Sequence, residues 1–93
     1  MVVKDKIIIV TGGALGIGRA LCRRFAIEGA RAIIVADINE DGAKAVAEEI
    51  KGKAVVCDVR REKDIQRLVA VTEEAFGSVD IFCSNAGILA IGG

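Results

Sequence analysis

Glycine spacing near the N-terminus predicts a binding site for a phosphate group. The apolar run Ile7–Val10 leads directly into the segment TGGALGIG at residues 11–18, and an amphipathic stretch follows. Gly12 can adopt the dihedral angles of a tight turn, and Gly16 lets a pyrophosphate approach the backbone. Gly18 lets the next helix pack closely on the strand, and the N–H groups that begin this helix attract an anion. A glycine-rich turn without a ligand is the alternative interpretation.

An acidic residue stands at the end of the next apolar run. Asp37 follows Gly18 by about 20 residues, the distance at which a carboxylate accepts hydrogen bonds from the ribose hydroxyls of a dinucleotide. A carboxylate at this point would repel a 2′-phosphate, so Asp37 favours NAD over NADP. The alternative role for Asp37 is to cap the helix that follows it.

The spacing G-x-x-x-G-x-G distinguishes this loop from two related ones. The common dinucleotide fingerprint is G-x-G-x-x-G, and a Walker loop needs Lys and Ser or Thr where Arg19 and Ala20 stand. A Thr-Gly-x-x-x-Gly-x-Gly segment after an N-terminal strand resembles the short-chain dehydrogenase/reductase family. The resemblance is to the main branch, because the extended branch has a glycine at the position of Leu15.

The resemblance implies roles for further residues at the ends of strands. In this family an Asp-Val pair, here Asp58 and Val59, contacts the adenine, and the carboxylate accepts a hydrogen bond from the amino group of the adenine. Asp58 could also cap the third helix, and the two roles are compatible. Members of the family that prefer NADP often carry a basic residue at the positions of Leu15 or Ile38, so the apolar residues found here again favour NAD.

The segment Ser84–Gly87 resembles the Asn-Asn-Ala-Gly motif of the family, with Ser84 in place of the first asparagine. That motif stabilises the central sheet and lines the ribose on the nicotinamide side.

We expect no catalytic residue and no metal ligand in this chain. The expected cofactor-binding residues are Gly12, Leu15, Gly16, Ile17, Gly18, Asp37, Ile38, Asp58, Val59, Asn85, Ala86 and Gly87.

Regular alternation of strands and helices positions these motifs. Apolar runs predict strands at 7–10, 32–36, 54–57 and 79–84. Helices are expected at about 17–28, with Ile17, Ala20, Leu21 and Phe25 facing inward, then from an Asn39 cap to Gly52, and then before Gly77.

This alternation predicts an α/β fold, the N-terminal half of a Rossmann-like, doubly wound parallel sheet with strand order 3-2-1-4 and three helices. The first two helices should cover one face and the third the other. The motifs then meet at the carboxyl ends of the strands, where such sheets bind ligands.

Composition narrows the class of protein. The chain has 93 residues, enough for one small domain, and its 13 basic residues balance 13 acidic ones. The balance of charge predicts no nucleic-acid or membrane-surface partner. No apolar run approaches the roughly 20 residues of a membrane span, so we expect no membrane association and a cytoplasmic location. Cys22, Cys57 and Cys83 lack a C-x-x-C spacing, and Cys57 and Cys83 are expected to be small buried side chains.

The resemblance implies that residues 1–93 are a single partial NAD-binding domain. Hydride transfer in the family needs a Tyr-x-x-x-Lys pair, and this sequence contains no tyrosine. We expect the parent to be a homo-oligomeric oxidoreductase that moves a hydride between a nicotinamide and a small alcohol or carbonyl compound. The alternatives are a catalytically silent dinucleotide-binding or regulatory module and, less favoured by the glycine spacing, a Rossmann-like methyltransferase. Residues 88–93 are expected to begin a substrate loop and to leave the fourth strand as an open edge, so the chain alone should be poorly stable.

Overall fold

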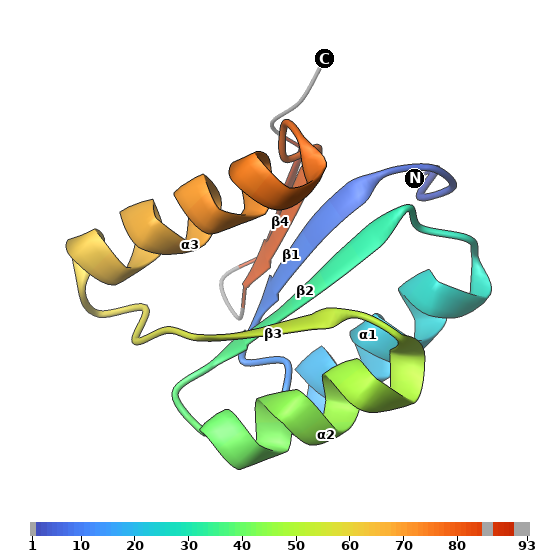
Figure 1. Cartoon of the computed structure of the whole chain (residues 1–93). Helices are drawn as coiled ribbons and strands as arrows, with labels where there is room; N and C mark the ends of the chain where they lie inside the picture. The colour runs from blue at the N-terminus through green and yellow to red at the C-terminus, as the bar shows by residue number, and fades with distance from the viewer. Residues whose placement is uncertain (1, 85–86, 91–93) are drawn as a thin grey trace.

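The computed structural model describes residues 2–84 and 87–90, with only the backbone of the last four, as one sheet between helices (Figure 1). The strands are β1 (Ile7–Thr11), β2 (Ala32–Asp37), β3 (Lys53–Val56), β4 (Ile81–Ser84) and β5 (Gly87–Ala90). The helices are α1 (Gly16–Ile27), α2 (Glu40–Ile50) and α3 (Glu62–Phe76).

The sheet has the order β3-β2-β1-β4-β5, which confirms the predicted order of the first four strands. These four are parallel, with Ile9 of the central strand paired to Ile34 of β2 and to Phe82 of β4. The predicted open edge at β4 is wrong, because β5 pairs with β4 in the antiparallel sense and Gly87 lies opposite Ser84. An antiparallel neighbour needs only a short connection, whereas a parallel one needs a crossover.

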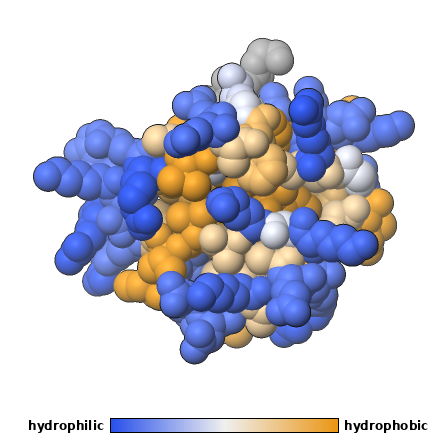
Figure 2. Space-filling model, in the orientation of Figure 1, coloured by the Kyte–Doolittle hydropathy of each residue, from blue (hydrophilic) through white to orange (hydrophobic). Residues whose placement is uncertain are grey.

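The two faces of the sheet are covered as the crossover rule predicts. On one face, side chains of α1 and α2 pack with Ile8, Val10, Ile33 and Val35, and the other face carries Leu68 of α3. In the part of the chain that the structure describes, α3 alone covers its face of the sheet, so apolar surface remains open beside it. Figure 2 shows this hydrophobic surface between α3 and β3, with hydrophilic residues around it. Val56 of the edge strand β3 is 36% exposed.

The inward face of α1 differs from the predicted stripe. Ile17 is 79% exposed and Ala20 is also exposed, whereas the buried residues of the helix are Gly18, Cys22 and Phe25. The close approach of Gly18 to the preceding turn fixes the rotation of the helix. Residues four and seven positions later then face the sheet.

Local contacts set the ends of the other elements. The side chain of Asn39 accepts a hydrogen bond from the N–H of Gly42 (3.0 Å), which confirms the predicted cap of α2. At the end of this helix the left-handed residue is Lys51 (φ 58°), while Gly52 allows close approach, since a Cβ there would lie 2.6 Å from the carbonyl oxygen of Ile33.

The fourth strand begins at Ile81, two residues later than predicted. The carboxylate of Asp80 accepts a hydrogen bond from the N–H of Ile7 (2.8 Å), and Val79 is buried just before it. A side chain therefore replaces one rung of backbone pairing at this end of β4. Among the helices described, none is long and apolar enough to cross a membrane.

Candidate functional site

The turn after β1 has the conformation that its glycines allow. Gly12 and Gly16 have positive φ angles of 68° and 58°, which side chains with a Cβ rarely adopt. A Cβ on Gly18 would lie 2.1 Å from the carbonyl oxygen of Gly12, so the helix and the turn touch through their backbones. A Cβ on Gly16 would meet no atom within 4 Å. The space over Gly16 is therefore open to a ligand, while Gly18 holds the turn against the helix.

The start of α1 offers backbone donors to an anion. Its N-cap is Leu15, whose side chain makes no capping hydrogen bond, and no acidic residue stands in the first turn. Leu15 and Ile17 are 68% and 79% exposed. The first N–H groups of a helix without a side-chain cap must find water or a ligand, and the helix dipole favours a negative one.

Asp37 links the end of β2 to the glycine-rich turn. Its Oδ2 accepts a hydrogen bond from the N–H of Ala14 (3.0 Å), and its Oδ1 accepts one from the N–H of Asn39 (2.9 Å). The N–H of Gly13 donates to the carbonyl oxygen of Ala36 (3.2 Å), beside the first of these bonds. Asn39 caps α2 in place of Asp37, so the carboxylate of Asp37 is directed toward the turn and the cleft.

Asp58, in the loop between β3 and α3, pairs with Arg60 instead of capping the helix. The Nε of Arg60 donates to Oδ1 and its Nη2 donates to Oδ2, both at 3.0 Å. These hydrogen bonds from Arg60 hold the pKa of Asp58 at about 2, below its ordinary value, so the carboxylate is ionised at neutral pH. The N-cap of α3 is Arg61, while the carboxylate of Asp64 accepts a hydrogen bond from the N–H of Asp58 (2.9 Å).

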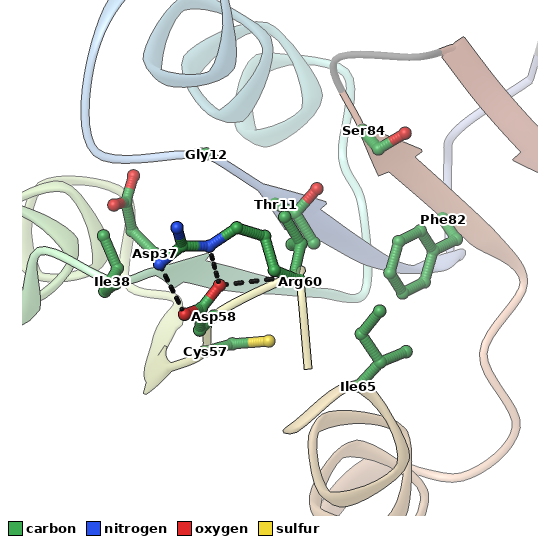
Figure 3. Close-up of a pocket in the computed structure, with 11 residues that line it drawn as sticks. Thr11, Gly12, Asp37, Ile38, Cys57, Asp58, Arg60, Ile65, Phe82 and Ser84 are labelled. Atoms are coloured by element: carbon green, nitrogen blue, oxygen red, sulfur yellow. Dashed lines mark hydrogen bonds and ion pairs between the residues drawn. The ribbon is translucent and has the colours of Figure 1, made fainter. Parts of the chain in front are cut away.

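A cleft of about 600 Å³ opens where these strands end (Figure 3). Figure 3 shows the side chains of Asp37 and Asp58 at the same side of the cleft, with the guanidinium group of Arg60 between them. Of the expected cofactor-binding residues, the cleft brings together Gly12, Asp37, Ile38, Asp58 and Val59.

The other expected residues lie elsewhere. Ile17 and Gly18 line a smaller hollow of about 90 Å³ that shares Thr11 and Ser84 with the cleft. Leu15 and Gly16 are exposed on the turn. Gly87 belongs to β5, and the positions of Asn85 and Ala86 are outside the described residues.

Six residues that line the cleft were not predicted as binding residues: Thr11, Cys57, Arg60, Ile65, Phe82 and Ser84. Thr11 donates from its hydroxyl group to the carbonyl oxygen of Cys83 (3.2 Å), which joins β1 to β4 at the base of the cleft. Cys57, Ile65 and Phe82 give the cleft an apolar floor. Their positions after β3, on α3 and within β4 could have indicated this, but only after the register of the strands was known.

The cysteines are free and buried. Burial raises the pKa of Cys22 to about 12, and burial also raises the pKa values of Cys57 and Cys83. In residues 2–84 and 87–90, no three histidine, cysteine or acidic side chains come together in a way that could hold a metal ion. The described residues that line the cleft offer the carboxylates of Asp37 and Asp58, the guanidinium group of Arg60, the hydroxyl-bearing Thr11 and Ser84, and apolar walls.

Comparison with known proteins gives consistent matches. Residues 6–93 match a family model described as short chain dehydrogenase. The chain is 42% identical over 88 residues to a (+)-cis,trans-nepetalactol synthase of Nepeta racemosa, covering 92% of this chain and 32% of that protein. It is also 42% identical over 85 residues to a mitochondrial (-)-isopiperitenol/(-)-carveol dehydrogenase of Mentha piperita, covering 88% of this chain and 32% of that protein.

Solved structures have the same fold. A 3-ketoacyl-(acyl-carrier-protein) reductase from Brucella melitensis, complexed with NADH, superposes with a TM-score of 0.81 and 34% identity. The superposition covers 86% of this chain and 34% of that one. The chain thus spans about a third of the length of these relatives.

Proposed function

The chain belongs to the short-chain dehydrogenase family, and on this premise we propose that it is the NAD-binding part of an oxidoreductase. The parent would transfer a hydride between the nicotinamide and a small alcohol or carbonyl compound. The observation that carries the proposal is the position of Asp37, whose carboxylate lies in the cleft and also contacts the turn that would hold the pyrophosphate.

The residues of the site fit a dinucleotide. The open space over Gly16 would receive the pyrophosphate, and the N–H groups at the start of α1 would donate hydrogen bonds to it. Asp37 would accept from the ribose hydroxyls. The apolar floor of the cleft and Asp58 would hold the adenine, while Asn85, Ala86 and Gly87 are proposed for the nicotinamide side.

Electrostatics support NAD rather than NADP. A 2′-phosphate would face Asp37, while Leu15 and Ile38, at 68% and 62% exposure, offer no positive charge to balance it. The cation that lines the cleft, Arg60, is already paired with Asp58 through both carboxylate oxygens. Among the described residues that line the cleft, two carboxylates and one guanidinium leave a net negative charge, and unbalanced like charges at a site cost several kcal/mol.

The chemistry of hydride transfer would require residues beyond those that bind the cofactor. When bound, the nicotinamide supplies the hydride donor or acceptor. A general acid or base must also exchange a proton with the alcohol or carbonyl oxygen, and the family's tyrosine for this step is absent from the 93 residues. The second candidate, a dinucleotide-binding module without catalysis, would need only the groups that line the cleft and begin α1.

Further parts of the proposal concern the surroundings of the protein. Three free, buried cysteines support a reducing compartment, and we keep the cytoplasm as the proposed one. We also propose a small-molecule substrate and a homo-oligomeric parent.

Titration of the purified chain with NADH and NADPH tests cofactor binding. We expect NADH to bind at least tenfold more tightly, and replacement of Asp37 by Ser together with Ile38 by Arg to shift the preference toward NADPH. Equal affinities of the unchanged chain for both would refute the NAD proposal, and binding of neither would refute the function. An alcohol panel with NAD should give no NADH from residues 1–93. A Tyr-x-x-x-Lys motif in coding sequence after Gly93 would distinguish the oxidoreductase from the silent module.

A further inference from the structure

Asp37 makes contacts within the protein that are not needed to accept hydrogen bonds from the ribose hydroxyls. Its two carboxylate oxygens accept from the N–H groups of Ala14 and Asn39, at 3.0 and 2.9 Å. Ala14 is only 3% exposed, so its N–H has little access to water in place of the carboxylate. A buried donor that loses its acceptor is costly, which makes this contact a strong restraint on the turn.

The turn is anchored on this side and projects freely on the other. Gly42 packs against Ala14 so closely that a Cβ on Gly42 would lie 2.9 Å from that of Ala14. The next residues, Leu15 and Gly16, are exposed, and Leu15 makes no side-chain capping bond. The direction in which α1 begins therefore depends on the anchors that precede it.

We propose that Asp37 is a positioning residue for the phosphate-binding turn as well as the residue that reads the ribose. Through Ala14 it fixes the place from which the first N–H groups of α1 meet the pyrophosphate. This inference rests on the proposed function. It implies that Asp37 affects the affinity for phosphate groups that the carboxylate itself never touches.

The charge of Asp37 alone would have the opposite effect. A carboxylate near a pyrophosphate repels it, so removing the carboxylate should strengthen binding of a phosphate ligand that has no ribose hydroxyls. If Asp37 positions the turn, removing both of its acceptor oxygens should weaken that binding. The sign of the change separates the two effects.

The test uses 2′,3′-dideoxy-ADP, which keeps the adenine and the pyrophosphate but lacks the hydroxyls that Asp37 would read. Asp37→Ala removes both acceptors, and the matched control Asp37→Asn removes the same charge but keeps one acceptor for Ala14. We expect calorimetry to show roughly tenfold weaker binding by Asp37→Ala, the loss typical of a charge-assisted hydrogen bond. Asp37→Asn should bind the ligand within about threefold of the wild type.

Amide hydrogen exchange gives a second readout that needs no ligand and shows whether the variants still fold. The N–H of Ala14 should exchange at least tenfold faster in Asp37→Ala than in Asp37→Asn, while amides of β1 stay protected in both. Equal or tighter binding of dideoxy-ADP by Asp37→Ala would overturn the inference. The inference would also be overturned if the wild type bound NADH but not dideoxy-ADP. If the wild type did not bind NADH, the proposed function itself would be refuted.

Discussion

Replacing Gly18 by Ala should damage the fold more than replacing Gly16 by Ala, although both glycines belong to the same turn. The new Cβ at position 18 would lie 2.1 Å from the carbonyl oxygen of Gly12 and 2.7 Å from its carbon. Real contacts of a Cβ essentially never fall below 3.0 Å, so helix and turn must separate by about 0.9 Å. Backbone cannot rotate away as a side chain can.

The magnitude follows from opposing terms. Overpacking of this kind costs up to about 3 kcal/mol, and the better helix propensity of Ala returns about 1 kcal/mol. A net loss of about 2 kcal/mol should lower the melting temperature by roughly 8–16 °C in a domain of this size. Gly16→Ala meets no atom, so it costs only the strain of its positive φ, about 1 kcal/mol or roughly 4–8 °C.

Thermal melting by circular dichroism and calorimetric titration with NADH measure the two effects separately. We expect Gly16→Ala to keep most of its stability and yet lose most of its affinity, because the methyl group occupies the space proposed for the pyrophosphate. A Gly18→Ala variant that melts within 4 °C of the wild type would refute the reasoning about close packing. Unchanged NADH affinity in Gly16→Ala would show that the turn does not hold the ligand.

Three further outcomes follow from contacts in the structure. Burial raises the pKa of Cys22 to about 12, so its thiol should resist iodoacetamide at pH 8 until the chain unfolds, and rapid labelling of the folded chain would contradict this. The stability of the fold should also fall as pH rises from about 9 toward 12, because only the unfolded thiol ionises in this range. Arg60→Ala should raise the pKa of Asp58 from about 2 toward its ordinary value, as measured by carbon NMR of the carboxyl group, and an unmoved pKa would show that the pairing is not formed in solution. In the unchanged protein, the stability that this pair contributes should disappear as pH falls toward 2. Asn39→Ala should cost about 1 kcal/mol, or roughly 4–8 °C in melting temperature, because the N–H of Gly42 loses its cap, and an unchanged melting temperature would exclude that role.

The order of the strands could be predicted because each apolar run is long enough for only one buried strand. Runs such as Ile7–Val10 and Ala32–Ala36 are buried on both faces, which is typical of central parallel strands, and glycines or Asn39 mark the helix boundaries between them. The rotation of α1 was not predictable in this way. It depends on one backbone contact of Gly18 that leaves Ile17 exposed, and hydropathy gives no information on such a contact.

Contacts between short segments account for the other differences. The sequence predicts that residues 88–93 begin a substrate loop, but residues 87–90 pair locally with β4. The positions of Asp37 and Asp58 at strand ends could be predicted from the sequence. The pairing of Asp58 with Arg60 and the contact of Asp37 with Ala14 depend on side-chain direction and turn geometry, which strand order does not specify.

The central position of β1 has a consequence for the order in which the molecule folds. The contact between Ala14 and Asp37 spans 23 residues, whereas the contact between Thr11 and Cys83 spans 72. Closing the longer loop costs about 1 kcal/mol more in chain entropy, and its residues leave the ribosome later. The glycine-rich turn and its acidic anchor can therefore assemble while β4 is still unpaired. Strand β1 thus pairs first with β2 and only later with its second neighbour, β4. The phosphate side of the cleft should therefore be in place before β4 docks and closes the cleft.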